Sequence, residues 1–376
     1  MKERKGTKVL LKILLILFIA VAAMAVFAFL FLKLWPAFGG KADESDRAEY
    51  AQRSENYADG MFFNSGEFSV MGQSVDPYAD RAGSKGDEPS DTLPTVTPTF
   101  LESPSVDDLT VTWFGHSTSL LQMQGMNILF DPVFSDITSP VSFVGVRRFS
   151  DLAMQAEALP HLDIVIISHD HYDHLDYPTI KKIDDKVDRY IVPLGVENHL
   201  ARWGVAAEKI VTMAWWEETE INGLNVACTP SRHYSGRSLN DRNATFWASW
   251  VLKNDRYRVF ESGDSGYGDH FAQIGETYGP FDLALVDCAQ YDTAWHDVHM
   301  FPEEAVSAAM EVNAQVVMPI HWGAFKLANH AWDDPAERLV LNAEENDLTV
   351  VTPMLGETVL WDEYENYQSR WWRDMQ

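Results

Sequence analysis

The amino-acid sequence predicts an α/β (α+β) domain in which two β-sheets pack face to face with helices outside, preceded by an N-terminal transmembrane helix. About a dozen short apolar runs, bounded by Gly, Pro, Asn and Asp, alternate with a few helical segments, as in a two-sheet domain. Residues 13–32 carry no polar side chain. The chain has 376 residues, of which 46% are hydrophobic, so it can form one large domain or two small ones.

The N-terminal residues 1–40 are predicted to be a membrane anchor. A helix over 13–32 would span a hydrocarbon core of about 30 Å. Basic residues precede this segment, and Lys33 and Trp35 follow it. The positive-inside rule therefore predicts a single-pass protein of the cell membrane, with its N-terminus cytoplasmic and its folded domain outside the cytoplasm. The alternative is a cleaved signal peptide, whose apolar region is usually shorter.

Residues 41–108 form a polar acidic linker or arm in this prediction. The segment is rich in Asp, Glu, Ser, Gly and Pro, a composition that does not support a core of its own. Two apolar islands interrupt it, at 61–64 and 68–71. They could dock on the domain surface or collapse only locally.

Residues 109–376 are predicted to be the folded domain. Short apolar runs predict strands at 110–114, 119–123, 127–131, 163–167, 189–193, 209–212, 224–229, 246–252, 257–262, 282–287, 315–319, 348–351 and 357–361. Helices are expected at 177–184, 195–203, 269–277 and 302–312. In the last of these, Pro302 starts the helix and Glu303 and Glu304 lie in its positive first turn.

Charge and cysteine content exclude some classes of protein. The formal net charge is −27, and no basic stripe is visible, so nucleic acid is not expected as a partner. The acidity also favours solubility. The two cysteines, Cys228 and Cys288, lie in separate apolar runs and are predicted to be buried free thiols rather than metal ligands.

The segment 167–176, Ile-Ser-His-Asp-His-Tyr-Asp-His-Leu-Asp, follows an apolar run that reads as a buried strand. In an extended chain His169 and His171 lie on the same side, and Asp173 and His174 could reach a second point nearby. Imidazole and carboxylate are ligands that zinc accepts. Histidine-rich runs also occur as solvated loops, but the position directly after a buried strand favours a metal site. We expect two metals and, with them, hydrolysis.

Further ligands are expected where other apolar strands end. His233, Asp264 and His321 each follow such a run and adjoin turn residues. Each one alone would more often be structural, and their shared placement makes the set more convincing than its members.

The order His-x-His-x-Asp-His, His, Gly-Asp, His resembles the metallo-β-lactamase superfamily. Within it the chain is most similar to the N-acyl-phosphatidylethanolamine phospholipase D-like family, through the segments 113–118, 130–135, 233–237 with 241–243, 263–267, 299–305 and 321–325. The resemblance implies a metallo-β-lactamase αββα sandwich with two Zn²⁺ ions per chain. One zinc would take His169, His171 and His233, the other would take Asp173, His174 and His321, and Asp264 would bridge them.

The function that the resemblance implies is a membrane-anchored, zinc-dependent phosphodiesterase. It would hydrolyse N-acyl-phosphatidylethanolamine or a related phospholipid, as a phospholipase D does, with hydroxide supplied by the metals. Asp173 could also orient the nucleophile. His299 is a candidate proton donor or a surface histidine at a helix start, and His116 is a candidate substrate-binding residue.

Two alternatives remain at this point, a hydrolase of a soluble metabolite such as a lactonase, and a non-enzymatic envelope protein that keeps the fold. Apolar residues beside the metals would favour a lipid substrate, and a closed basic pocket would favour a phosphorylated sugar. The oligomeric state is left open.

Overall fold

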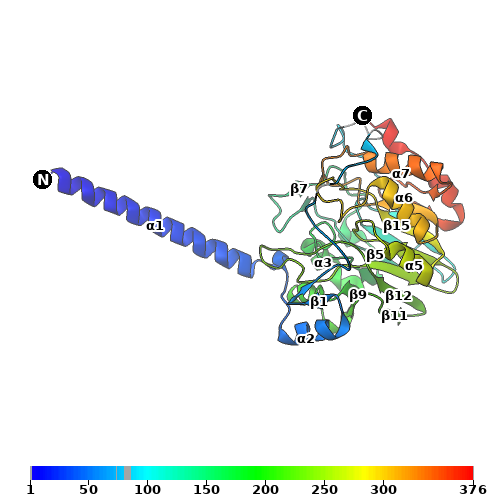
Figure 1. The fold of residues 1–376 in the computed structure, drawn as a ribbon, viewed down its shortest axis with the longest axis horizontal. Coiled ribbons are helices and arrows are strands. Elements are labelled where there is room, and N and C mark those ends of the chain that lie inside the picture. Colours follow the sequence, from blue (N-terminus) through cyan, green and yellow to red (C-terminus); the bar gives the residue numbers. More distant parts are fainter. Residues whose placement is uncertain (1, 73, 80–85, 376) are drawn as a thin grey trace.

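The computed structural model describes residues 2–72, 74–79 and 86–375, and its centre is a pair of seven-stranded sheets (Figure 1). The strands of the first sheet are β3 (Leu109–Trp113), β4 (Ser119–Met123), β5 (Met126–Phe130), β8 (Leu162–Ile166), β9 (Val187–Pro193), β10 (Ile210–Met213) and β18 (Thr358–Leu360). Those of the second are β11 (Glu218–Ile221), β12 (Leu224–Thr229), β13 (Ser249–Lys253), β14 (Arg258–Glu261), β15 (Phe281–Asp287), β16 (Ala314–Ile320) and β17 (Thr349–Val350).

Both sheets mix parallel and antiparallel pairs. The first has the order β10–β9–β8–β5–β4–β3–β18, and the second has the order β11–β12–β13–β14–β15–β16–β17. β4 pairs with β5 antiparallel, whereas β5 pairs with β8 and β15 with β16 in parallel. A small separate hairpin is formed by β6 (Ile137–Thr138) and β7 (Val146–Arg147).

Alternating side chains of each strand separate the layers. In β5, Ile128 and Phe130 join the core that the two sheets share, whereas Leu129 joins the cluster under the helices of the first sheet. This period of two is what a strand buried on both faces requires. Cys228 and Cys288 are buried and free, as predicted.

Helices cover the outer faces, which confirms the αββα sandwich. On the first sheet these are α3 (Tyr177–Ile183) and α4 (Glu197–Arg202). On the second they are α5 (His270–Tyr278), α6 (Pro302–Glu311) and α7 (Asp334–Glu345) (Figure 1). The sequence prediction lacked α7 and the edge strand β11.

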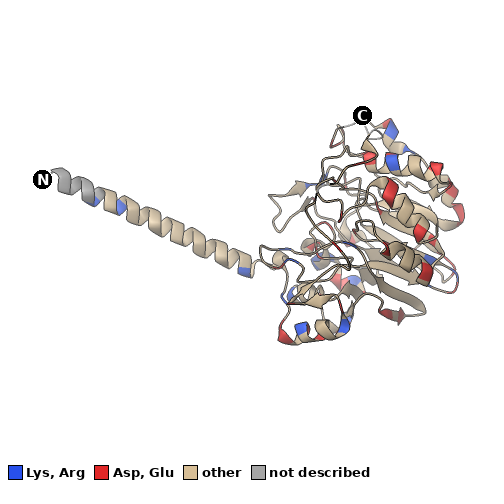
Figure 2. Ribbon diagram, in the orientation of Figure 1, with Lys and Arg blue, Asp and Glu red and all other residues tan. Residues whose placement is uncertain are grey.

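The N-terminal helix α1 (Lys2–Leu34) extends away from the domain (Figure 1). Its segment Leu10–Leu34 is long and apolar enough to cross a membrane, and none of it is buried against the rest of the structure. Figure 2 shows this apolar stretch between basic residues near its two ends. A membrane anchor and a signal sequence both fit these properties.

The arm contains ordered elements that the sequence prediction did not include. These are α2 (Glu44–Arg53) and a hairpin of β1 (Tyr57–Ala58) and β2 (Met61–Phe62). Tyr50 and Phe62 are buried, and the Phe62 ring stacks on Phe246 of the domain. The apolar island at 61–64 therefore docks on the domain. Positions 73 and 80–85 of the predicted arm lie outside the described residues.

Candidate metal centre

Four loops bring all seven predicted ligands together at one edge of the sandwich. His169, His171, Asp173 and His174 follow β8, while His233, Asp264 and His321 follow β12, β14 and β16. The side chains follow the carboxyl ends of their strands by between one residue, for His321, and eight residues, for His174, so the sheets fix where the loops start. His171 and Asp173 are partly exposed, and the other five are buried.

The side chains form two groups with Asp264 between them. In the first, ligand atoms of His169, His171, His233 and Asp264 lie within 4.8 Å of one another. In the second, the same limit holds for Asp173, His174 and His321 together with His116. The Asp264 carboxylate reaches both groups, because its Oδ2 lies 3.7 Å from His233 Nε2 and 3.1 Å from His174 Nε2. The two groups contain the side chains of the two ligand sets that the resemblance implies, with His116 as an additional member of the second group.

The chemistry of these side chains fits bound metal ions. His321 Nε2 is buried and makes no hydrogen bond to any residue that the structure describes, and His174 Nε2 lies beside two carboxylates, 3.1 Å from Asp264 Oδ2 and 3.5 Å from Asp173 Oδ2. Burial, together with the neighbouring imidazoles, holds the pKa of His169 and of His233 well below the ordinary value. These two rings are therefore neutral near pH 7 and keep the lone pair that a metal needs, whereas, despite its burial, the carboxylates around His174 raise its pKa well above the ordinary value, so metal binding there would displace a proton.

Partners behind the ligands set their orientation. Asp131, directly after β5, lies with Oδ2 2.7 Å from His174 Nδ1, and its Oδ1 accepts a hydrogen bond of 2.7 Å from the Ser168 N–H. His233 Nδ1 lies 3.1 Å from the carbonyl oxygen of Val298. Both contacts place the proton on Nδ1 and leave Nε2 as the ligand atom. Asp131 was not among the predicted ligands or site residues, although it follows a buried strand just as Asp264 does.

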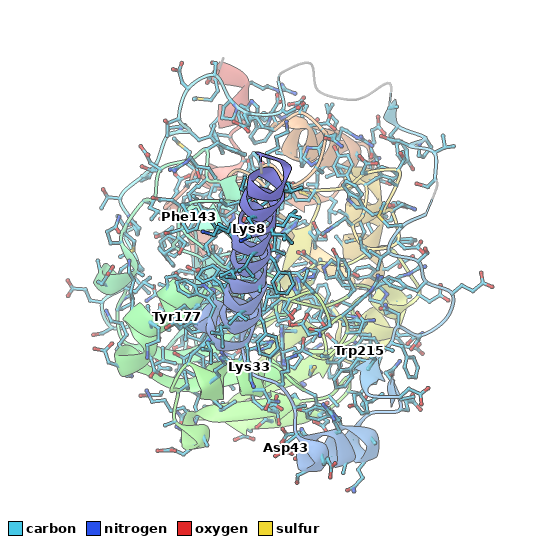
Figure 3. The ribbon with its side chains drawn as sticks, turned by 90° about the vertical axis from the view of Figure 1, so that its left-hand side faces the viewer. Lys8, Lys33, Asp43, Phe143, Tyr177 and Trp215 are labelled. Carbon is cyan, nitrogen blue, oxygen red and sulfur yellow. The ribbon has the colours of Figure 1, made fainter. Side chains whose placement is uncertain are left out.

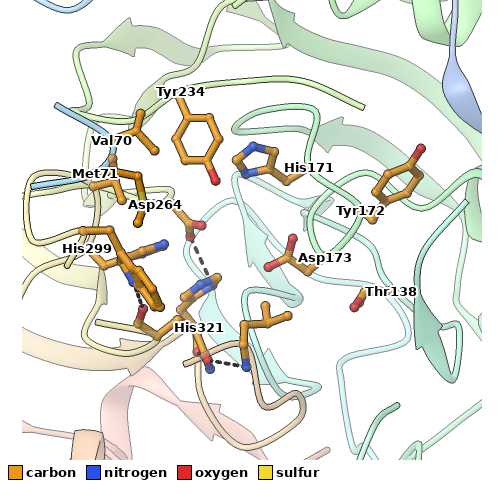
Figure 4. A pocket seen from close by; sticks show the side chains of 14 residues that line it. Val70, Met71, Thr138, His171, Tyr172, Asp173, Tyr234, Asp264, His299 and His321 are labelled. Atoms are coloured by element: carbon orange, nitrogen blue, oxygen red, sulfur yellow. Dashed lines mark hydrogen bonds and ion pairs between the residues drawn. The ribbon is translucent and has the colours of Figure 1, made fainter. Parts of the chain in front are cut away.

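The site opens into a cavity of about 390 Å³ (Figure 4). Polar groups line one part of it, namely His171, Asp173, Asp264, His299 and His321, and apolar side chains line another part, namely Val70, Met71, Trp295, Val298 and Leu327. None of the described residues that line it is a lysine or an arginine. Figure 4 shows the Tyr234 hydroxyl directed into the cavity, and Tyr234 was not among the predicted site residues.

The two remaining predicted residues lie in different places. His299 lines the cavity, and its Nδ1 lies 3.1 Å from Asp287 Oδ2. Burial alone would lower the pKa of His299, but the Asp287 carboxylate raises it above the ordinary value. His116 is fully buried behind the site, with Nε2 2.9 Å from Asp173 Oδ2, and is not among the residues that line the cavity. Its contact is with a predicted ligand rather than with the space where substrate would bind.

Comparisons with known proteins agree with this geometry. A family model described as the beta-lactamase superfamily domain matches residues 126–322. An uncharacterized protein of Mycobacterium tuberculosis is 41% identical over 329 residues, which are 85% of this chain and 87% of that protein. The N-acyl-phosphatidylethanolamine-hydrolyzing phospholipase D 1 of Caenorhabditis elegans is 34% identical over 288 residues, 72% of this chain and 80% of that protein.

A solved structure shows the same fold. It is a metallo hydrolase from the archaeon Ignicoccus hospitalis, with a TM-score of 0.51 at 22% identity, covering 67% of this chain and 97% of that one. The chain belongs to the metallo-β-lactamase superfamily, in the branch of the N-acyl-phosphatidylethanolamine phospholipase D-like proteins. The superfamily is one of metal-dependent hydrolases, and the His and Asp cluster is this chain's candidate metal site.

Proposed function

We propose that this protein is a membrane-anchored phosphodiesterase with a dinuclear zinc site, which hydrolyses N-acyl-phosphatidylethanolamine or a related phospholipid on the head-group side of the phosphorus. The observation that carries the proposal is the cavity, where two groups of candidate ligands face apolar walls without a basic residue. The apolar walls can accommodate an acyl chain, whereas they offer no lysine or arginine to pair with the charge of a sugar phosphate. The names of the relatives and the apolar helix α1 point the same way.

The proposed ligand sets are His169, His171 and His233 for one zinc, and Asp173, His174 and His321 for the other, with Asp264 between them. Bound zinc ions would supply hydroxide near neutral pH and positive charge for the phosphoryl oxygens. The remaining work falls to residues of the chain.

Three side chains of the cavity have roles in the proposed reaction. Asp173 is held by His116 at the cavity wall, where its carboxylate can orient the attacking water. His299 is oriented by Asp287 through Nδ1, so its Nε2 can give a proton to the leaving head-group oxygen. Tyr234 can donate a hydrogen bond to the substrate phosphate. Water adds to phosphorus, the phosphorus–oxygen bond to the head group breaks, and the products are a phosphatidate and an N-acylethanolamine.

The test is hydrolysis by the purified full-length protein in detergent, with a panel of N-acyl-phosphatidylethanolamine, phosphatidylcholine, a cyclic nucleotide, a lactone and a β-lactam. The proposal requires release of N-acylethanolamine, and in water labelled with ¹⁸O the label must enter the phosphatidate. Turnover of the lactone without turnover of the phospholipids would contradict the proposal and favour the soluble-metabolite alternative.

A further inference from the structure

The segment that joins α1 to the domain is fixed to the domain surface. The Trp203 Nε1–H donates to the Pro36 carbonyl oxygen at 2.7 Å, and the Arg237 Nε–H donates to the Ala37 carbonyl oxygen at 3.0 Å. Ala37 is buried. Because the chain is held directly after α1 ends, the direction of α1 relative to the domain is set by these contacts.

The loop between β6 and β7 lies beside this junction. The Trp35 Nε1–H donates to the carbonyl oxygen of Pro140 in the loop at 2.5 Å. At the tip, Phe143 is 80% exposed and Val144 is 61% exposed. Figure 3, seen from the side on which α1 leaves the domain, shows Phe143 on the face that surrounds α1. Two adjacent large apolar side chains beside the end of an apolar helix suit a lipid environment better than water.

We propose that the Phe143–Val144 tip enters the interface of the same bilayer that α1 spans, so that the domain rests on the membrane at two points. The inference extends the proposed function, since the lipid nature of the substrate rests on that proposal. The hairpin also connects the membrane to the catalytic cavity. Thr138 of β6 and Tyr172 line that cavity, and Tyr172 also lines a second cavity of about 340 Å³ with Trp35 and Pro140. A lipid at the membrane surface would thus lie next to the site entrance.

The test places a spin label on the full-length chain in phospholipid nanodiscs. Phe143→Cys can be labelled selectively, because Cys228 and Cys288 are buried. Met310→Cys on α6, 46% exposed in the wild-type protein and far from α1, is the matched control. The label at 143 should be more accessible to oxygen than to a water-soluble nickel complex, and the label at 310 should show the reverse. Equal water accessibility at both positions would overturn the inference.

A double substitution, Phe143→Ser with Val144→Ser, separates this inference from the proposed function. Hydrolysis of vesicle-bound substrate should fall about tenfold or more, while hydrolysis of the same substrate in detergent should be unchanged. Unchanged hydrolysis on vesicles would contradict the membrane contact. A lipid-exposed label in a protein that cleaves no phospholipid would leave the membrane contact standing and refute the proposed function alone.

A separate observation concerns Asn64, which belongs to the arm and lies outside the matched family domain of residues 126–322. Its Nδ2 donates to the His233 carbonyl oxygen at 2.7 Å, and its Oδ1 accepts from the His233 N–H at 3.2 Å. The Trp247 Nε1–H also donates to Oδ1, at 3.1 Å. Asn64 is 8% exposed, so these bonds are shielded from water.

The geometry points to Asn64 as a positioning residue for the metal site. The Asn64 side-chain amide pairs with both the backbone N–H and the backbone carbonyl of His233, which lies in a loop beyond the end of β12. Within a sheet, a neighbouring strand would make such bonds. Fixing the backbone of His233 fixes the position of its imidazole relative to His169 and His171. Residues that orient a ligand in this way commonly contribute about 10–100-fold to metal affinity. The arm would then be a part of the site rather than a spacer.

The test compares Asn64→Ala with Asn254→Ala in the full-length protein. Asn254 is similarly buried, at 6% exposed, and its Oδ1 accepts from two backbone N–H groups in the turn between β13 and β14. Both variants should lose thermal stability, but only Asn64→Ala should weaken zinc binding, by about tenfold or more in a chelator competition. Asn64→Asp, which keeps the acceptor and loses the donor, should fall between. Wild-type zinc affinity in Asn64→Ala would refute the assignment.

Discussion

Replacing Asp131 by Asn tests whether the partners behind the ligands tune the metal site. In the wild-type protein, Asp131 Oδ2 accepts from His174 Nδ1 at 2.7 Å, so Nε2 is the ring nitrogen left to bind a metal. An asparagine keeps one oxygen for the Ser168 N–H but places an amide NH₂ group near His174 Nδ1. The imidazole would then accept at Nδ1 and carry its proton on Nε2, the atom that is needed as a ligand.

The magnitude follows from this change of tautomer. Loss of a contact of this kind lowers metal affinity by about 10–100-fold, which is about 1.4–2.8 kcal/mol. Asp176→Asn is the matched control, because Asp176 is also buried but its Oδ2 accepts from the Ser135 hydroxyl at 2.7 Å instead of from a ligand. Both substitutions remove a buried carboxylate, so general destabilisation should be similar in the two.

The assay is a competition for zinc between the protein and a fluorescent chelator, with thermal unfolding measured in parallel. We expect weaker zinc binding for Asp131→Asn and near wild-type binding for Asp176→Asn. If both variants kept wild-type affinity, the orienting role of Asp131 would be refuted. If both variants lost zinc affinity equally, the loss would reflect general destabilisation of the fold rather than a change at His174.

Three further perturbations test separate parts of the account. His171→Ala should abolish hydrolysis and reduce bound zinc while unfolding stays cooperative, and full activity in steady-state assays would refute the ligand assignment. Tyr234→Phe should lower kcat/KM by about 10–100-fold if its hydroxyl donates to a charged phosphate, and unchanged kinetics would exclude that contact. The hydrogen bond that His296 Nε2 donates to the Glu304 carboxylate raises the pKa of His296 in the folded state. The stabilisation by this ion pair is therefore complete below the unfolded value of 6.5 and is lost as pH rises through the folded value. Glu304→Gln should therefore cost up to about 1 kcal/mol more at pH 5.5 than at pH 8.5 in chemical unfolding, and equal costs would contradict the ion pair.

Most of the sandwich could be predicted from local patterns. The strands that carry ligands, such as β8, β12 and β16, are apolar runs followed by turn residues, and those signals are strong. The helix α7 was missed although its buried residues Ala336, Leu339, Val340 and Ala343 have helical spacing. The strand β11 was missed because its sequence, Glu-Thr-Glu-Ile, is polar and lies at a sheet edge.

The arm was harder to predict for a physical reason. Its helix α2 is polar apart from a few residues, and Tyr50 is the residue of that helix that is buried. Such a helix is stabilised by the surface on which it docks, here around Glu197 and Phe246, rather than by its own pattern. Composition therefore indicated a linker where the folded chain has an ordered layer.

The difference between local sequence patterns and tertiary contacts also decides which residues of the site could be predicted. The histidines and aspartates of the two groups could be found because each follows a strand in the sequence. Asn64 and Tyr234 reach the site through tertiary contacts that no local pattern marks, whereas Asp131 follows a buried strand and could have been found in the same way as Asp264. His116 shows the converse, since its position after a strand suggested substrate contact while the fold places it behind Asp173.

In the proposed reaction, two metal ions held by these seven side chains are required for hydrolysis of a phospholipid diester. The direct measurement is a titration of metal-free, full-length protein with zinc while the release of N-acylethanolamine is recorded. We expect no hydrolysis without metal and a rise that reaches its plateau at two zinc ions per chain. Full hydrolysis by the metal-free protein, or a plateau at one zinc ion per chain, would contradict a dinuclear catalytic site.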